Sequence, residues 1–163
     1  NAAAVLNDNS DIKFLIYGAG SELERLKLRI ANEGLKNIKL KGFVEKKYIP
    51  YILSKSSVSI LNYSQTQYNW ARGNSSNKLF EYMASGKPII STVKMGYCII
   101  DKYKCGFSLS ECTPQKLVET ILKINNIPKE QYNELAMNAR NGALDFDYTV
   151  LTDKLVDVIN TVM

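Results

Sequence analysis

Residues 73–91 read GNSSNKLFEYMASGKPIIS, and this stretch decides the fold because a polar loop, a short amphipathic helix and a buried strand follow one another directly. At about 100° per residue, the helix has an apolar face (Leu79, Phe80, Met83, Ala84) and a polar face (Lys78, Glu81, Tyr82, Ser85). Gly86 before Pro88 favours a helix end, and a strand follows. The sequence therefore predicts a short helix that packs on a sheet with one face and lines a cleft with the other.

The start of this helix has the composition of an anion-binding site. Ser75, Ser76 and Asn77 are residue types that cap helix N-termini. The first-turn amide hydrogens have no partner within a helix and carry the positive end of its dipole, so an anion placed there gains several donors at once. Lys78 adds a full positive charge. We expect these four residues to hold phosphate groups.

Glu81 lies one turn further along the helix, on the same polar side. An ionised carboxylate offers only acceptors, so it can receive hydrogen bonds from the hydroxyl groups of a sugar or ribose. The alternative is a surface ion pair with Lys78 at i, i+3, which contributes roughly 0.2–0.5 kcal/mol. A nucleoside diphosphate carries the groups that the helix start and Glu81 would each bind.

These residues resemble a known family. The run from Ser76 to Pro88 looks like the donor-site signature of retaining glycosyltransferases with two facing Rossmann-like domains, specifically the group 1 (GT4) transferases of capsule and O-antigen assembly. Phe14–Gly20 and Leu40–Val44 are similar to two strands and turns of that family, and Asn138–Arg140 and the closing helix also fit. The resemblance covers nearly the whole chain, but only the second, donor-binding half of such an enzyme.

The resemblance implies an α/β fold: a single doubly wound parallel-sheet (Rossmann-like) domain, the C-terminal half of a GT-B glycosyltransferase. Residues 1–163 then form the nucleotide-sugar-binding domain, with residues 1–11 as a linker or the start of a fragment and residues 149–162 as the closing helix. In such transferases the last helix crosses back to the partner domain. The N-terminal acceptor domain is expected to be absent, so the isolated chain is expected to bind the donor without catalysing transfer.

The resemblance also implies roles for individual residues. Glu81 becomes the ribose-binding acid. Val44 aligns with the position that contacts the nucleobase, although a lone valine more often belongs to a core. Gly73 is expected to belong to the donor nucleotide-binding site; it stands where the broader family has an acid, a departure shared with the polysaccharide subgroup that has Ser-x-Asn-Lys. Gly18 and Gly20 either form a tight strand-to-helix turn or let the donor approach the backbone closely.

The rest of the chain alternates strands and helices, which is typical of parallel βαβ units. The apolar runs predict strands at residues 12–17, 37–41, 57–61, 89–92 and 106–109. Helices are expected at residues 21–34, where Ser21 and Glu24 form a capping box, and at residues 46–54 and 98–103. Three more helices follow Thr113, which is expected to cap the first of them.

The polar stretch 62–76 is longer than the usual connection in a βαβ unit, which favours a functional loop. Trp70 and Arg72 lie within it and either touch the donor sugar or, in the case of the aromatic ring, anchor the loop by packing.

Composition places the chain among ordinary globular domains. It has 163 residues, 45% hydrophobic and 23% charged, which is enough to bury one core without metal or disulfide cross-links. The three cysteines have neither the number nor the spacing of a disulfide framework or a zinc site, so a reducing, cytoplasmic location is expected. No apolar run approaches the ~18 residues that a membrane span needs. The full-length enzyme is expected at the cytoplasmic face of the membrane.

The net charge of +5 comes from one segment. Residues 36–55 hold six lysines and a single glutamate. This excess is either a solvated surface or a rim that faces an anion or a membrane. Nucleic acid is excluded as the expected partner because the lysines lack interleaved arginines and a recognisable reader motif.

Several other site classes are disfavoured. Gly18-x-Gly20 lacks the third glycine and the distal acid of a dinucleotide fingerprint. Asp145 and Asp147 have the spacing of a metal-binding pair, but Asp147 precedes the last predicted helix and reads as its N-cap. No cofactor and no metal are expected. With no histidine in the chain, acid–base chemistry through imidazole is also excluded.

The sequence therefore predicts the donor-binding domain of a retaining glycosyltransferase, of hexosyltransferase type. Such an enzyme moves a sugar from a nucleoside diphosphate, with UDP expected, to a polysaccharide or lipid-linked acceptor. Its expected partners are the nucleotide-sugar donor, the N-terminal acceptor domain and the inner membrane face. The alternatives are a nucleotide-sugar 2-epimerase-like domain, which needs acid–base residues, and a non-catalytic nucleotide-binding or regulatory domain.

Overall fold

The computed structural model describes residues 1–9, 11–64, 70, 73 and 76–162. Within these residues the strands are β1 (Phe14–Tyr17), β2 (Ile38–Gly42), β3 (Ser59–Leu61), β4 (Ile89–Ser91) and β5 (Gly106–Ser108). The α-helices are α1 (Ala2–Val5), α2 (Leu23–Asn32), α3 (Ile49–Ser54), α4 (Asn77–Ala84), α5 (Ile99–Tyr103), α6 (Pro114–Asn126), α7 (Lys129–Leu144) and α8 (Tyr148–Val162). A 3-10 turn, η1 (Lys46–Tyr48), precedes α3. The predicted α/β class and the predicted order of strands and helices are confirmed.

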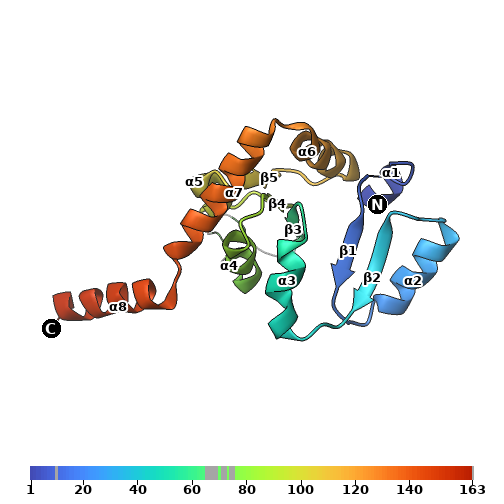
Figure 1. Cartoon of the computed structure of the whole chain (residues 1–163). Coiled ribbons are helices and arrows are strands. Elements are labelled where there is room, and N and C mark those ends of the chain that lie inside the picture. The colour runs from blue at the N-terminus through green and yellow to red at the C-terminus, as the bar shows by residue number, and fades with distance from the viewer. Residues whose placement is uncertain (10, 65–69, 71–72, 74–75, 163) are drawn as a thin grey trace.

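All strand pairs are parallel, but the strands form two sheets rather than the single sheet that was predicted. β1 pairs with β2, while β3, β4 and β5 pair in that order. Figure 1 shows β1 lying on the side of β2 that faces β3. Among the described residues, β1 and β3 share no backbone ladder; β3 is three residues long and pairs with β4 alone.

Side chains join the two sheets in place of a ladder. The cluster of Leu6, Ile90, Val118, Ile121 and Ile124 collects partly buried residues from both sheets, among them Phe14 of β1 and Ile60 of β3. A second cluster, built on Met83, Ile89 and Cys105, lies between α4, α5, α7 and the three-stranded sheet. The core therefore sits around β3, β4 and β5, with β1 and β2 attached to its edge.

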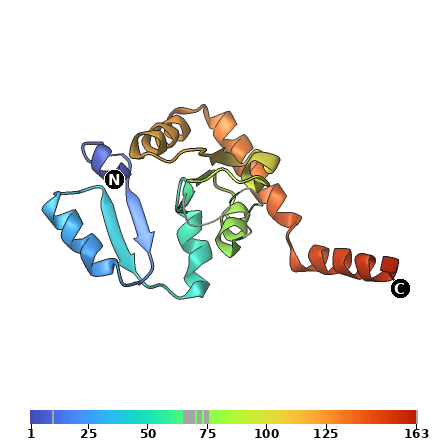
Figure 2. The ribbon, with the colours of Figure 1, turned by 180° about the vertical axis from the view of Figure 1, so that it is seen from behind.

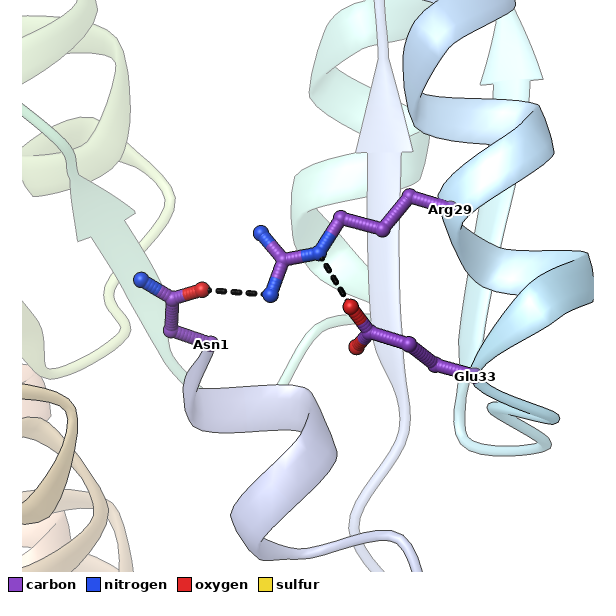
Figure 3. Close-up of polar contacts among 3 residues, drawn as sticks. All are labelled: Asn1, Arg29 and Glu33. Carbon is purple, nitrogen blue, oxygen red and sulfur yellow. Dashed lines mark hydrogen bonds and ion pairs between the residues drawn. The ribbon is translucent and has the colours of Figure 1, made fainter.

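The start of the chain is helical and packed, which does not fit the linker reading of residues 1–11; the other reading, the start of a fragment, stays a prediction. Residues 2–5 form α1, which packs on α6 and buries Ala3 and Leu6. Figure 3 shows how Arg29 of α2 holds this segment: its Nη2 donates to Asn1 Oδ1 (2.7 Å) and its Nε to Glu33 Oε1 (2.6 Å). The hydrogen bond from Arg29 holds the pKa of the Glu33 carboxyl below its usual value. The buried amide of Asn37 also donates to the Ala3 carbonyl at 2.8 Å.

The helix caps predicted at Thr113 and Asp147 both form. The Thr113 side chain accepts from the Lys116 amide at 3.2 Å, and the Asp147 carboxylate accepts from the Thr149 amide at 2.9 Å. The capping box at Ser21 is wrong, because α2 begins two residues later, at Leu23, and Glu24 turns to Lys27 instead. Since glutamate and lysine at i, i+3 meet on the helix surface, that ion pair competes with the box.

The last helix stands apart from the rest of the molecule. Seen from the front and from behind, α8 projects away from the body beyond the end of α7 (Figures 1 and 2). It has no buried residue, and its exposed side chains include Leu151, Leu155, Val158 and Ile159. No helix in the described part of the chain has both the length and the apolar character needed to cross a membrane.

Candidate functional site

At the start of α4, the first-turn amides have no side-chain cap from the described residues. Ser76 occupies the N-cap position in an extended conformation (φ −102°, ψ 136°), but its hydroxyl makes no capping hydrogen bond. Its carbonyl accepts from the Leu79 amide at 2.8 Å, and the side chains of Asn77 and Lys78 are exposed. Ser75, the fourth residue predicted to bind phosphate, lies outside the described residues. A helix start with free amides and an adjacent lysine is suited to an anion.

Packing on two sides fixes the orientation of α4. Leu79 and Met83 are buried against the sheet, and the Phe80 ring packs on Phe146 with ring centres 4.6 Å apart. Two residues lie on the opposite face of α4 from the one predicted. Ala84, predicted on the apolar face, is exposed, whereas Tyr82, predicted on the polar face, packs partly against the core. The reason is that α4 packs against α7 as well as against the sheet. Its buried face is therefore wider than the face predicted for a helix that packs on a sheet alone.

Glu81 is half-buried on α4, one turn from the open amides. The surface pair with Lys78 does not form: among the described residues neither side chain has an ion-pair partner. Burial raises the pKa of the neighbouring Tyr82 phenol, and the charge of Glu81 adds to this shift. The Glu81 carboxylate therefore has no ion-pair partner among the described residues and lies beside a phenol whose pKa is raised.

Trp70, which precedes α4, packs on an aromatic ring, as one of the two readings of Trp70 predicted. The Trp70 ring lies 5.1 Å from the Tyr63 ring, and its Nε1 donates to the Ser64 carbonyl at 3.1 Å. Thr92 holds the exit of β3 against the exit of β4, since the Tyr63 amide donates to Thr92 Oγ1 at 2.7 Å. Arg72, named with Trp70 as a contact of the donor sugar, lies outside the described residues.

The loop after β4, residues 93–97, belongs to the same site, and the sequence analysis did not single it out. The amides of Gly73 and Gly96 both donate to the Trp70 carbonyl, at 3.0 and 2.9 Å. Gly73 has φ +78°, and a Cβ there would lie 3.0 Å from the Tyr97 carbonyl oxygen. Gly73 therefore lets the two loops touch. The one signal in the sequence was Gly96 followed by an exposed aromatic, Tyr97.

The remaining predicted residues gather at the ends of β1 and β2. The Gly18 amide donates to the Gly42 carbonyl at 2.7 Å, which places the Gly18–Gly20 turn beside the turn that carries half-buried Val44. Gly18 has φ +139°, which side chains rarely adopt, whereas a Cβ on Gly20 would meet no atom within 4 Å. Gly18 and Gly20 also line a cavity of about 220 Å³ with Ile16, Leu23, Leu26 and Leu40.

The site thus consists of two groups at the carboxyl ends of parallel strands, where ligands of α/β folds bind. One group is the start of α4 with Glu81 and the 93–97 loop, and the other is the pair of turns after β1 and β2. No hydrogen bond joins the two groups within the residues that the structure describes. A ligand that contacts both must therefore span the space between them, as a nucleotide with its base at one end and phosphates at the other would.

Asp145 and Asp147 have structural partners. Asp145 accepts a 2.5 Å hydrogen bond from the Tyr103 hydroxyl, and Asp147 caps α8. Across the described part of the chain, no three histidine, cysteine, aspartate or glutamate side chains gather as metal ligands would. A cavity of about 290 Å³ between β5, α6 and α7 has no lining residue from α4 or from the glycine turns.

Comparison with known proteins gives a family from the sequence and a fold from the solved structures. The family model for group 1 glycosyl transferases matches residues 1–142. A search of curated proteins finds no match. Among solved structures, similar folds include Anabaena HepE in complex with UDP-glucose (TM-score 0.77, 17% identity) and pneumococcal O-GlcNAc transferase GtfA in complex with UDP and GlcNAc (0.73, 19%). Sucrose-phosphate synthase from Thermosynechococcus elongatus is a third (0.75, 16%).

These alignments cover 98%, 99% and 99% of this chain but only 44%, 32% and 42% of the respective solved chains. At such identities the likeness establishes the fold, and the family follows from the sequence match over residues 1–142. On this evidence, the chain belongs to the group 1 glycosyl transferase family.

Proposed function

We propose that this chain is the donor-binding half of a retaining glycosyltransferase. In this proposal the enzyme moves a hexose from a UDP-sugar to a polysaccharide or lipid-linked acceptor, as in capsule and O-antigen assembly. The observation that carries the proposal is the start of α4, which no described side chain caps, with Glu81 one turn further on and without an ion-pair partner in the described part of the chain. The complexes of HepE with UDP-glucose and of GtfA with UDP support the choice of UDP.

Each part of the site has a role in this proposal. The amides of Asn77 and Lys78, the Lys78 ammonium and the side chains of Ser75 and Ser76 would bind the diphosphate, and Glu81 would accept from the ribose hydroxyls. Val44 would contact the base beside the Gly18–Gly20 turn, and Gly73 would keep the donor loop close to residues 93–97.

The proposed chemistry is stabilisation of the departing diphosphate. As the sugar–phosphate bond breaks, negative charge grows on the leaving oxygen, and fixed amide dipoles with Lys78 are already oriented to meet it. No metal ion is needed in this scheme, so chelation should leave nucleotide binding unchanged. Catalysis also needs an acceptor, which in this proposal is held by an N-terminal domain, so this chain alone would bind UDP-sugar without transferring it.

The apolar side chains of α8 support a contact with that second domain. Leu151, Leu155 and Val158 are exposed at spacings of three and four residues, which places them on one face of the helix. In the full-length protein we propose that this face packs against the N-terminal domain, and that the enzyme works at the cytoplasmic face of the membrane.

A thermal-shift titration with UDP and UDP-glucose tests the donor site. Ligand that binds only the folded state raises the melting temperature, and Glu81→Gln should weaken binding roughly ten- to hundredfold by removing a charge-assisted hydrogen bond. Glu119→Gln is the matched control, because Glu119 is an exposed helical carboxylate on α6, away from the site. No shift of the intact protein at millimolar UDP-sugar, or equal shifts in Glu81→Gln and the control, would refute the proposal.

A further inference from the structure

Positive charge is concentrated on a part of the chain that lies outside the proposed phosphate site. Residues 36–55 carry Lys36, Lys39, Lys41, Lys46, Lys47 and Lys55 against Glu45, and the segment contains no arginine. Its excess of five positive charges equals the net charge of the whole chain. The charge of the rest of the molecule therefore balances, and this segment sets its electrostatic field.

Large aromatic side chains are exposed among these lysines. Phe43 is 76% exposed, Tyr51 66% and Tyr48 50%, and the lysines of η1 and the end of α3 are also exposed. We call Phe43, Lys46, Lys47, Tyr48, Tyr51 and Lys55 the basic–aromatic surface. Isolated exposed apolar residues are common, but three aromatics within nine positions of one basic segment are a patch.

The helical spacing places much of this surface on one side. Lys47, Tyr51 and Lys55 follow one another at intervals of four residues, whereas Leu53 is buried on the other side of α3. Lys47 Nζ lies 5.1 Å from the centre of the Tyr48 ring, and Lys55 Nζ lies 5.6 Å from that of Tyr51. Figure 1 shows α3 rising from the lower edge of the molecule, after the end of β2.

We propose that the basic–aromatic surface docks the enzyme on an anionic lipid bilayer. Lysines near such a bilayer are attracted to its negative surface potential, and phenol and phenyl rings are favourable at the boundary between headgroups and acyl chains. Lysine acts as a point charge without the planar fork by which arginine recognises individual phosphates, which fits a diffuse charged surface. Nucleic acid fits less well, because the segment has neither interleaved arginines nor a recognisable reader motif.

This inference rests on the proposed location at a membrane face and names the surface responsible. α8 is a poor competitor for the same bilayer, because its charged residues are Asp153, Lys154 and Asp157, a net charge of −1. An acidic helix is repelled by anionic lipid, whereas the basic–aromatic surface is attracted to it. The dependence of vesicle binding on lipid charge therefore distinguishes docking through the basic–aromatic surface from docking through α8.

Co-sedimentation with vesicles tests the proposal. The chain is mixed with vesicles of pure phosphatidylcholine or of phosphatidylcholine with one-third phosphatidylglycerol, at low and high salt. Binding should require the anionic lipid and weaken as salt rises. The double variant Lys46→Gln/Lys55→Gln should lower the partition coefficient by about tenfold or more, given the contribution of each lysine near such a surface. Tyr48→Ser/Tyr51→Ser should weaken binding at unchanged charge.

The matched control is Lys129→Gln/Lys154→Gln, which removes two exposed lysines outside the surface and changes the net charge equally. The proposal is overturned if the control loses binding as much as Lys46→Gln/Lys55→Gln, if neutral vesicles bind equally well, or if single-stranded RNA binds more tightly than anionic vesicles. The UDP-glucose thermal shift of each variant is measured in parallel. A normal shift with lost vesicle binding supports the docking surface, and a missing shift in the intact protein counts against the donor site alone.

Discussion

Gly73 shows how one residue sets the geometry of the proposed donor loop. Its φ of +78° lies in the left-handed region, and the Tyr97 backbone and Cβ approach within 3.0–3.2 Å of where a side chain would begin. The sequence analysis assigned Gly73 to the donor site, as the residue that replaces an acid, and did not predict its packing. Its packing role depends on Tyr97, 24 positions later, and no local pattern predicts such a contact.

Gly73→Ala should therefore destabilise the protein more than the backbone conformation alone explains. The left-handed region costs an alanine about 1–2 kcal/mol, and the contact with Tyr97 should add about 1 kcal/mol more. Gly34→Ala is the control, because Gly34 has φ +60° with no atom within 4 Å of the new Cβ. Urea unfolding measures both. Equal losses of unfolding free energy would show that the two loops do not touch as described.

Cys105 is expected to be unreactive toward thiol reagents in the folded protein. It is fully buried, and burial raises the pKa of its thiol to about 12, so the reactive thiolate is scarce at pH 8. A thiol reagent should label the half-buried Cys98 and Cys112 first and Cys105 only on unfolding. Because the unfolded thiol releases its proton at lower pH than the folded one, stability should fall as pH rises above about 9. Cys105→Ala should lose this part of the pH dependence, and rapid labelling of native Cys105 would contradict the account.

Helix α4 is the element that local sequence predicted best. Its bounds, its exposed Lys78 and its buried Leu79 and Met83 follow from short-range patterns of capping and periodicity, which tertiary packing leaves intact. The faces of Ala84 and Tyr82 were exchanged because α7 also packs on α4. The capping box at Ser21 failed because a local ion pair competed with it. That the donor-site residues of α4 bind a ligand stays a prediction.

The pairing of β4 with β5 depends on Gly106. A Cβ at this position would lie 1.8 Å from the Ile89 carbonyl oxygen, closer than any side chain tolerates. Gly106→Ala should thus force the two strands apart and cost about 3 kcal/mol or more. Gly20→Ala, whose Cβ meets no atom, should cost less than about 0.5 kcal/mol. Thermal unfolding of both variants checks this, and a Gly106→Ala protein as stable as Gly20→Ala would disprove the close approach.

At the scale of the whole molecule, the sequence predicted the alternation of parallel strands and helices but not their division into two sheets. The alternation of strands and helices can be predicted from the local apolar runs. Pairing between β1 and β3 instead depends on segments more than 40 residues apart. The role of residues 1–9 was missed for the same reason, since α1 gains its partners from α6 and from the region around Arg29. The apolar side chains of α8 are exposed, and the chain covers less than half the length of the solved structures that it resembles.

The central claim is that nucleoside diphosphate sugar binds at the start of α4. Amide NMR of the isotope-labelled chain titrated with UDP-glucose tests it most directly, because each backbone N–H reports its own surroundings. The account predicts that the amides of Asn77 and Lys78 shift most, with smaller shifts at Gly18 and Val44, and that a Glu81→Gln chain needs roughly tenfold more ligand for the same change. Shifts confined to the cavity between α6 and α7, with the α4 amides unmoved at saturation, would contradict it.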